Sequence, residues 1–280
     1  MNFCNDCGSY GQPLFNCERP QCGFYATQRD CLQTPSASSC LVSKVPLVSI
    51  AGVDEGVNPL ELKNLCEQYP NLELSVLYKT DTQSKPRYPG TSWRKEFLNL
   101  IPKNRCAIHL CGEGVFREIL SPVFVYTDSW KEISQYGRVQ LNINAFKKVF
   151  RQEEVFDIYS KLLSLGCSII LQYNSNTKED ILKYVEYCPQ RAKRYVDILI
   201  DGSKGQGIEL NIADVLIVNN LFKGHFVSFA GGIKDSNVTQ IVNNIENIRK
   251  SYDFGIDLES GVRTDFDKFS LARVRDLMKK

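Results

Sequence analysis

Three short apolar segments in the last third of the chain constrain its fold most strongly. They read VDILIDGSKGQG (Val196–Gly207), FVSFAGGI (Phe226–Ile233) and FGIDLESGV (Phe254–Val262). Each begins with β-favouring residues, ends in a polar or glycine-rich tip, and is separated from the next by a stretch long enough for a helix. This spacing is typical of βαβ units. It predicts parallel strands, and in such folds the carboxyl-terminal strand tips carry the chemistry.

The same alternation of apolar runs and helical stretches extends back to Lys44. Eight βα units in about 235 residues predict an α/β fold, the (β/α)8 TIM barrel. A doubly wound sheet is disfavoured because no G-x-G-x-x-G follows the first strand. Besides the three segments above, strands are expected over Pro46–Ala51, Leu74–Tyr78, Cys106–Leu110, Arg138–Ile143 and Ser168–Gln172. Helices are expected over Pro59–Gln68, Ser92–Leu100, Gln152–Leu165, Thr177–Arg194, Asn237–Lys250 and Lys268–Lys280, and one or two helical pieces within Glu113–Gln135.

Length and charge limit the classes of protein to consider. At 280 residues the chain can hold one large domain, the barrel over residues 44–280, and a small appendage over residues 1–43. A net charge of +2 gives no case for binding nucleic acid or an anionic membrane. No apolar run is long enough to span a bilayer, and the start lacks a signal-peptide pattern. We therefore expect a cytoplasmic protein, with its oligomeric state left open.

The first forty residues hold six of the eleven cysteines. Four of them form two close pairs, CNDC (Cys4, Cys7) and CERPQC (Cys17, Cys22). Such pairs can surround one Zn²⁺ tetrahedrally, and without a secretory signal metal binding is favoured over a disulfide-bearing extension. We expect a small structural zinc-binding segment and no organic cofactor. Either of the two further cysteines, Cys31 and Cys40, could replace one of the four ligands.

The strand tips offer candidate catalytic groups. Asp201 follows three apolar residues at the end of a strand and is the strongest candidate for a general acid, with a loop-capping aspartate as the competing interpretation. His109 and Cys111 are two residues apart, so both face into the barrel or both face out, and core packing is the alternative for each. Asp54, just beyond the first strand, is a further candidate.

Other tip residues are candidates for binding a substrate. Arg87 could hold a substrate carboxylate through two parallel hydrogen bonds. Asn142 and Asp257 lie at the tips of the fourth and eighth strands. Glycine-rich tips let backbone N–H groups converge on an anion, and a following helix adds its positive end. The predicted phosphate-binding residues are Gly205, Gly207, Gly231, Gly232, Ser260 and Gly261, although ordinary βα turns without a ligand have the same pattern.

These residues together resemble phosphoribosylanthranilate isomerase, a TIM-barrel enzyme family of tryptophan synthesis. An aspartate ends the sixth strand, followed by a glycine-rich loop, an A-G-G tip and a D-x-x-S-G-V tip in this order. SKPRYPGTSW (Ser84–Trp93) and VQLN (Val139–Asn142) also resemble the family's second loop and fourth strand. The matching segments of the last third are ILIDGSKGQGIEL (Ile198–Leu210), SFAGGIKDSNV (Ser228–Val238) and GIDLESGVRTDFDKFSLARVRDLM (Gly255–Met278).

The resemblance implies an Amadori rearrangement, in which an aminoaldose phosphate becomes an aminoketose phosphate. This reaction needs an acid to open the ribose ring and a base to move the proton on C2. The family's acid matches Asp201, its substrate-carboxylate arginine matches Arg87, and its phosphate turns match the glycine tips of the last two strands.

One departure from the family pattern concerns the base. The family ends its first strand with a cysteine base in a K-I-C-G pattern, whereas this chain has SIAGV (Ser49–Val53), with Ala51 in place of the cysteine. The family's L-H-G at the fourth strand is LNI (Leu141–Ile143) here. An alanine cannot move a proton, so another group must act as base, or the reaction differs, or catalysis is lost.

Three functional hypotheses follow. The first is an isomerase of a phosphoribosyl or other phosphosugar substrate, with Asp201 as acid and a base unlike the family's. The second is a lyase, hydrolase or epimerase acting on a phosphorylated sugar or nucleotide with the same phosphate turns. The third is a catalytically inactive barrel that binds a ligand or partner, with the zinc segment as contact surface.

We predict that the gently purified protein contains about one zinc ion per chain, because two thiolate pairs complete a tetrahedral site. Metal analysis by mass spectrometry measures this directly. The matched control replaces Cys4 and Cys7 by serine, which should abolish the bound metal. A metal content near zero in the unaltered protein would exclude the site.

Overall fold

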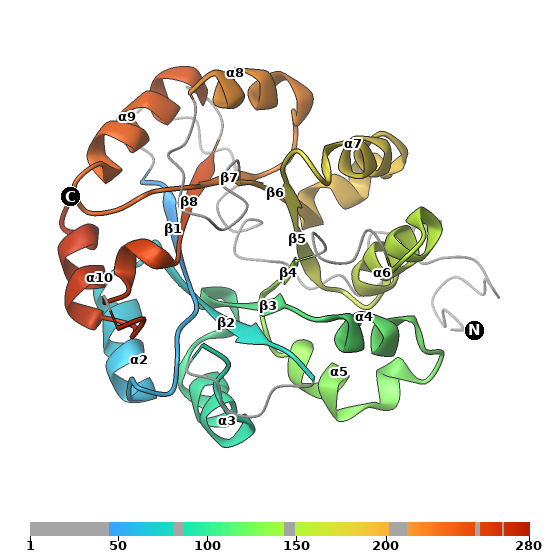
Figure 1. Cartoon of the computed structure of the whole chain (residues 1–280), viewed down its shortest axis with the longest axis horizontal. Coiled ribbons are helices and arrows are strands. Elements are labelled where there is room, and N and C mark those ends of the chain that lie inside the picture. The colour runs from blue at the N-terminus through green and yellow to red at the C-terminus, as the bar shows by residue number, and fades with distance from the viewer. Residues whose placement is uncertain (1–44, 81–86, 143–148, 202–211, 250–252, 265) are drawn as a thin grey trace, which may run out of the picture.

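Eight parallel strands form a closed barrel in sequence order, with the last strand hydrogen-bonded to the first (Figure 1). Helices surround the barrel on its outside. The predicted (β/α)8 barrel is therefore confirmed. The computed structural model describes residues 45–80, 87–142, 149–201, 212–249, 253–264 and 266–280. The predicted zinc ligands lie outside these ranges, and so do Gly205 and Gly207.

The strands lie close to the ranges expected from the apolar runs. The first five match the predicted bounds to within two residues at each end. The strands are β1 (Leu47–Ala51), β2 (Leu72–Tyr78), β3 (Cys106–Leu110), β4 (Arg138–Leu141), β5 (Ser168–Tyr173), β6 (Val196–Asp201), β7 (Val227–Ala230) and β8 (Phe254–Leu258).

Some of the helices begin at recognisable sequence signals. The first described helix starts at Pro59, and the side chain of Asn58 accepts a hydrogen bond from the backbone N–H of Leu60.

No helix in the described part of the chain is long and apolar enough to cross a membrane. The α-helices are α2 (Pro59–Gln68), α3 (Thr91–Leu100), α4 (Glu113–Leu120), α5 (Asp128–Ile133), α6 (Gln152–Ser164), α7 (Lys178–Tyr187), α8 (Ile212–Leu221), α9 (Val238–Arg249) and α10 (Leu271–Met278).

One predicted helix is divided in the structure. The expected helix Thr177–Arg194 ends as α7 at Tyr187, and a separate 3-10 helix covers Gln190–Tyr195. The cause is Pro189, because proline disfavours the helical conformation of the residue before it and lacks an N–H. Cys188 is accordingly extended, with φ −64° and ψ 122°.

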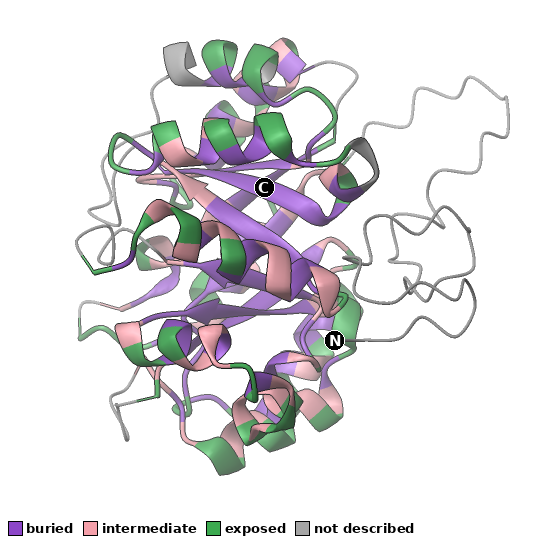
Figure 2. Ribbon diagram, turned by 90° about the vertical axis from the view of Figure 1, so that its right-hand side faces the viewer, coloured by how far each residue is buried: buried purple, intermediate pink, exposed green. Residues whose placement is uncertain are grey.

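The apolar core lies between the strands and the helices, where Figure 2 shows the buried residues concentrated. Alternate strand residues such as Ile50, Val76 and Ile108 face this layer and are fully buried. The inside of the barrel is different. Its inward positions include Ser49, Ser75 and several charged residues, whereas bulky branched residues usually fill this space.

A buried ion network crosses the barrel at its amino-terminal end. The Arg138 guanidinium on β4 donates two hydrogen bonds to Glu73 on β2, at 2.8 and 2.6 Å. It also donates one to Asp197 on β6, at 2.8 Å. All three residues are buried. The three strands alternate around the barrel, so one cation ties together strands that are not hydrogen-bonded neighbours.

We predict that Arg138→Met lowers the free energy of unfolding by about 3–5 kcal/mol, because it leaves two buried carboxylates without their counter-charge. Urea denaturation at pH 7 measures the change. The control is the triple variant Glu73→Leu, Arg138→Met, Asp197→Leu, which removes all three charges and should recover most of the loss. Equal destabilisation of the single and triple variants would contradict this account.

Candidate active site

Strand register places the inward side chains in layers of four, each from alternate strands. His109 and Cys111 both belong to this inward set. Three layers follow from the register, from the strand tips downward. They are Leu77, Asn142, Asp201 and Glu259; then Ala51, His109, Gln172 and Ala230; then Ser75, Gln140, Leu199 and Asp257.

Asp201 ends β6 and lies in the layer at the strand tips. The side-chain amide of Gln172 on β5 donates a hydrogen bond of 2.6 Å to its Oδ2 atom. Asp201 is itself buried, and the amide orients its carboxyl group. The predicted candidate acid thus occupies the end of the barrel where the strand tips converge.

His109 and Cys111 face into the barrel but are nearly inaccessible. Burial, with a smaller contribution from the Arg138 charge, lowers the pKa of His109 to about 3, so the imidazole is neutral at physiological pH. Its Nε2 atom is buried without a hydrogen-bond partner. Burial raises the pKa of the Cys111 thiol to about 11, while Tyr88 and Asn142 hydrogen-bond to it. Neither group presents a charged form near pH 7.

Asp54 joins the first and last strand loops. One carboxylate oxygen accepts a hydrogen bond from Arg263 Nη2 at 2.7 Å and another from the backbone N–H of Phe269 at 3.3 Å. Arg263 also donates to the carbonyl of Gly52 at 2.6 Å. These contacts bind the chain after β8 to the chain after β1, and they engage the Asp54 carboxylate in a structural role.

Arg87 lies at the mouth of the barrel, the end where the strand tips converge. Two carboxylates of this chain hold it there. It forms a bidentate pair with Asp267 at 2.8 and 2.6 Å, and its Nη1 atom lies 2.5 Å from Glu259. Hydrogen bonding to Arg87 is the main reason that the pKa of Asp267 falls to about 2. Arg87 remains 38% exposed, so the guanidinium is accessible from solvent.

The two glycine tips lie against each other at the end of β7 and β8. Gly231 and Gly232 have positive φ, +117° and +59°, a region that favours glycine. Gly261 belongs to the short 3-10 helix Ser260–Val262, and an added Cβ there would lie 2.2 Å from the carbonyl oxygen of Ile233. Only glycine therefore allows the loop after β8 to approach the loop after β7 this closely.

The turn after β7 leads directly into α9. Asn237, one residue before this helix, donates from its side-chain amide to the carbonyl of Gly232 at 3.0 Å. Its Oδ1 atom accepts from the backbone N–H of Lys234 at 2.9 Å. These bonds hold the glycine turn next to the positive end of the helix.

Asn142 and Asp257, the remaining predicted substrate-binding residues, are both half-buried. Asn142 follows β4 and its side chain contacts Cys111. Asp257 lies on β8 and hydrogen-bonds with Ser49 of β1. Among the described residues no three His, Cys, Asp or Glu side chains gather as a metal site would require.

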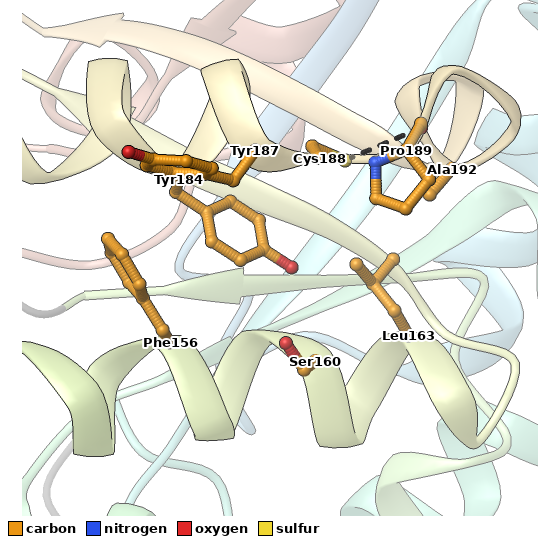
Figure 3. A pocket seen from close by; sticks show the side chains of 8 residues that line it. All are labelled: Phe156, Ser160, Leu163, Tyr184, Tyr187, Cys188, Pro189 and Ala192. Atoms are coloured by element: carbon orange, nitrogen blue, oxygen red, sulfur yellow. Dashed lines mark hydrogen bonds between the residues drawn. The ribbon is translucent and has the colours of Figure 1, made fainter. Parts of the chain in front are cut away.

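A pocket of about 220 Å³ lies elsewhere, on the outer wall of the barrel (Figure 3). It is formed between α6 and the end of α7 by residues such as Phe156, Leu163, Tyr184 and Pro189. No charged side chain lines it, and no residue of the strand tips contributes to it. We therefore place the candidate active site at the strand tips.

A family model matches the second half of the chain. Residues 121–280 match the model for N-(5'-phosphoribosyl)anthranilate isomerase, which is more than half of the chain. The chain belongs to this family. The matched residues of this chain include Asp201, Asp257 and both glycine tips. No protein with a curated description matches the sequence.

Solved structures share the fold at low sequence identity. The phosphoribosyl anthranilate isomerase from Thermococcus kodakaraensis is 15% identical, with a TM-score of 0.52 over 84% of this chain and 98% of that one. The isomerase from Pyrococcus furiosus gives 0.51 at the same identity and coverages. The N-terminal domain of a putative aldolase from Bacteroides vulgatus gives 0.51 at 14% identity, covering 84% and 80% of the two chains. These likenesses show the barrel fold.

Three residues at the mouth were not anticipated from the sequence. Tyr88 hydrogen-bonds to Cys111, and Glu259 and Asp267 pair with Arg87. A local signal existed for Glu259 alone, because it lies two residues after Asp257 and therefore shares its inward face. Tyr88 and Asp267 reach the site from loops, where periodicity gives no direction.

Proposed function

We propose that the protein is an isomerase that converts a phosphoribosyl amine from its aldose to its ketose form, with Asp201 as general acid. The observation that carries the proposal is the position of Asp201. Its carboxyl group, oriented by Gln172, lies at the same end of the barrel as the glycine tips of β7 and β8. Family membership supports the same assignment.

In the proposed binding mode, different residues at the strand tips contact the phosphate, the ribose and the carboxylate of the substrate. The phosphate would lie at the turns of Gly231, Gly232 and Gly261, next to the amino-terminal end of α9. The ribose would then lie over the inner layers, where Asp201 can donate a proton to the ring oxygen and open the ring. Arg87 would contact a carboxylate at the other end of the substrate.

A second candidate is another reaction on a different phosphosugar, using the same turns. Two observations favour it. Ala51 occupies the position of the family's cysteine, and Arg87 is already paired with Glu259 and Asp267. A substrate without a carboxylate would leave those ion pairs undisturbed.

A thermal-shift titration distinguishes the two candidates. Ligands that bind only the folded state raise the melting temperature, by about 2.7 kcal/mol of added stability at a concentration of 100 Kd. We expect a reduced phosphoribosylanthranilate analogue to stabilise the protein far more than ribose 5-phosphate or inorganic phosphate. Stabilisation by ribose 5-phosphate equal to that by the analogue would favour the second candidate. No shift with any ligand would contradict both.

Turnover of phosphoribosylanthranilate tests the role of Asp201. We expect Asp201→Asn to lower kcat by about 10²- to 10⁴-fold, because the amide cannot protonate the ring oxygen. The rate at which phosphoribosylanthranilate is consumed gives kcat. The control Asp276→Asn changes an exposed carboxylate on α10 and should leave the rate unchanged. Wild-type rates in Asp201→Asn would disprove the assignment of the acid.

A further inference from the structure

Asp257 lies one layer below two alanines, Ala51 and Ala230. In the strand register it pairs with Ala230 of β7 and Ser49 of β1. Ala51 lies two residues beyond Ser49, on the same face and one layer nearer the tips. The side chains directly above Asp257 on both neighbouring strands are therefore single methyl groups. Asp257 is half-buried, whereas Ser49 and Ser228 beside it are buried.

The surroundings of Asp257 raise the pKa of its carboxyl group, so that it stays partly protonated near neutral pH. Burial is the main cause that raises its pKa to about 7, with Glu259 and Glu73 adding repulsion. The hydrogen bond from Ser49 and the charge of Arg138 act in the opposite direction. A carboxyl group that exchanges its proton near the working pH suits general acid–base catalysis.

The other candidate bases are less suitable, either because they are already engaged or because of their pKa. Asp54 is engaged by Arg263 and by the backbone N–H of Phe269. Burial lowers the pKa of His109 to about 3, which makes its imidazole a weak base. The Cys111 thiol holds its proton tightly, since burial raises its pKa to about 11.

We propose that Asp257 is the catalytic base that takes the proton from C2, in place of the cysteine that the family carries at the position of Ala51. This inference rests on the proposed isomerase function. In the register the short side chain of Ala51 lies one layer above Asp257, so no thiol lies between the strand tips and this carboxylate.

The proton transfers balance with these two carboxyl groups alone. Asp201 donates its proton to the ring oxygen as the C1–O bond breaks and the nitrogen lone pair forms the C1–N double bond. The Asp257 carboxylate removes the C2 proton, and the C2–H electron pair forms the C1–C2 double bond of an enolamine. Asp257 then returns a proton to C1, while the C2 hydroxyl loses its proton to Asp201. The product is the aminoketose, and both groups recover their starting forms.

We expect Asp257→Asn to lower kcat for phosphoribosylanthranilate by at least about 100-fold. The amide keeps the shape of the side chain and can still hydrogen-bond with Ser49, so thermal stabilisation by the reduced analogue should persist. Restoring the family thiol in the double variant Asp257→Asn, Ala51→Cys should recover about tenfold or more of the lost rate. A merely structural role for Asp257 would not be rescued by a thiol on the neighbouring strand.

The melting temperature provides a second measurement that also shows whether the variant folds. The pKa of Asp257 is raised in the folded state, so its ionisation costs stability as the pH rises from the unfolded value of about 4 to about 7. Asp257→Asn should therefore raise the melting temperature at pH 8 and leave it unchanged near pH 3.5.

The outcomes separate this inference from the proposed function. If the kcat of Asp257→Asn lies within about threefold of the wild-type value while Asp201→Asn is inactive, the isomerase function stands and Asp257 is not the base. If Asp257→Asn is inactive but the thiol restores nothing and the analogue no longer binds, Asp257 has a binding role and the inference is overturned. A wild-type protein that binds the analogue without turnover would refute both proposals.

Discussion

The hydrogen-bonded seam between β8 and β1 is the constraint on which the rest of the structure depends. Residues Leu47–Ile50 pair in register with Gly255–Leu258 and close the sheet, so that no strand has a free edge. Closure then sets the register all around the barrel. Glu73, Arg138 and Asp197, which are far apart in sequence, meet in one layer as a consequence. The same seam places Asp257 beside Ser49 and below Ala51.

The distribution of positive charge explains why Asp257 differs from the other acids of the barrel. Arg138 binds two carboxylates two layers below Asp257, and Arg263 binds Asp54 in the loops above. Asp257 forms a hydrogen bond with Ser49, and among the described residues the charge of Arg138 is the one positive charge that lowers its pKa noticeably. A buried carboxyl group with less positive charge and fewer hydrogen-bond donors around it holds its proton more tightly. Arg138 is thus already paired with Glu73 and Asp197, and Asp257 remains an acid poised for proton transfer.

Regular features of the fold were predictable, and the contacts at the mouth were not. The apolar runs predicted all eight strands because each strand is short, continuous and buried on both faces. The end of α7 was missed because helical segments lie on both sides of Pro189 and the expected helix ran through it. The partners of Arg87 lie 172 and 180 residues further along the chain, and nothing local indicates such pairs. The positions of Asp201 and the glycine tips could be anticipated because strand ends define them.

The ion pairs of Arg87 do not by themselves exclude a substrate carboxylate. Arg87 and Glu259 are about one-third exposed, and Asp267 is more exposed still. Ion pairs at such exposure contribute only about 0–1 kcal/mol each, so a substrate could replace the single contact to Glu259 at small cost. The bidentate pair with Asp267 could persist and hold the guanidinium in place. Discrimination between the two candidate reactions therefore depends less on Arg87 than on the layer of Ala51 and Ala230. There the removal of one thiol changes which group can reach the reacting carbon.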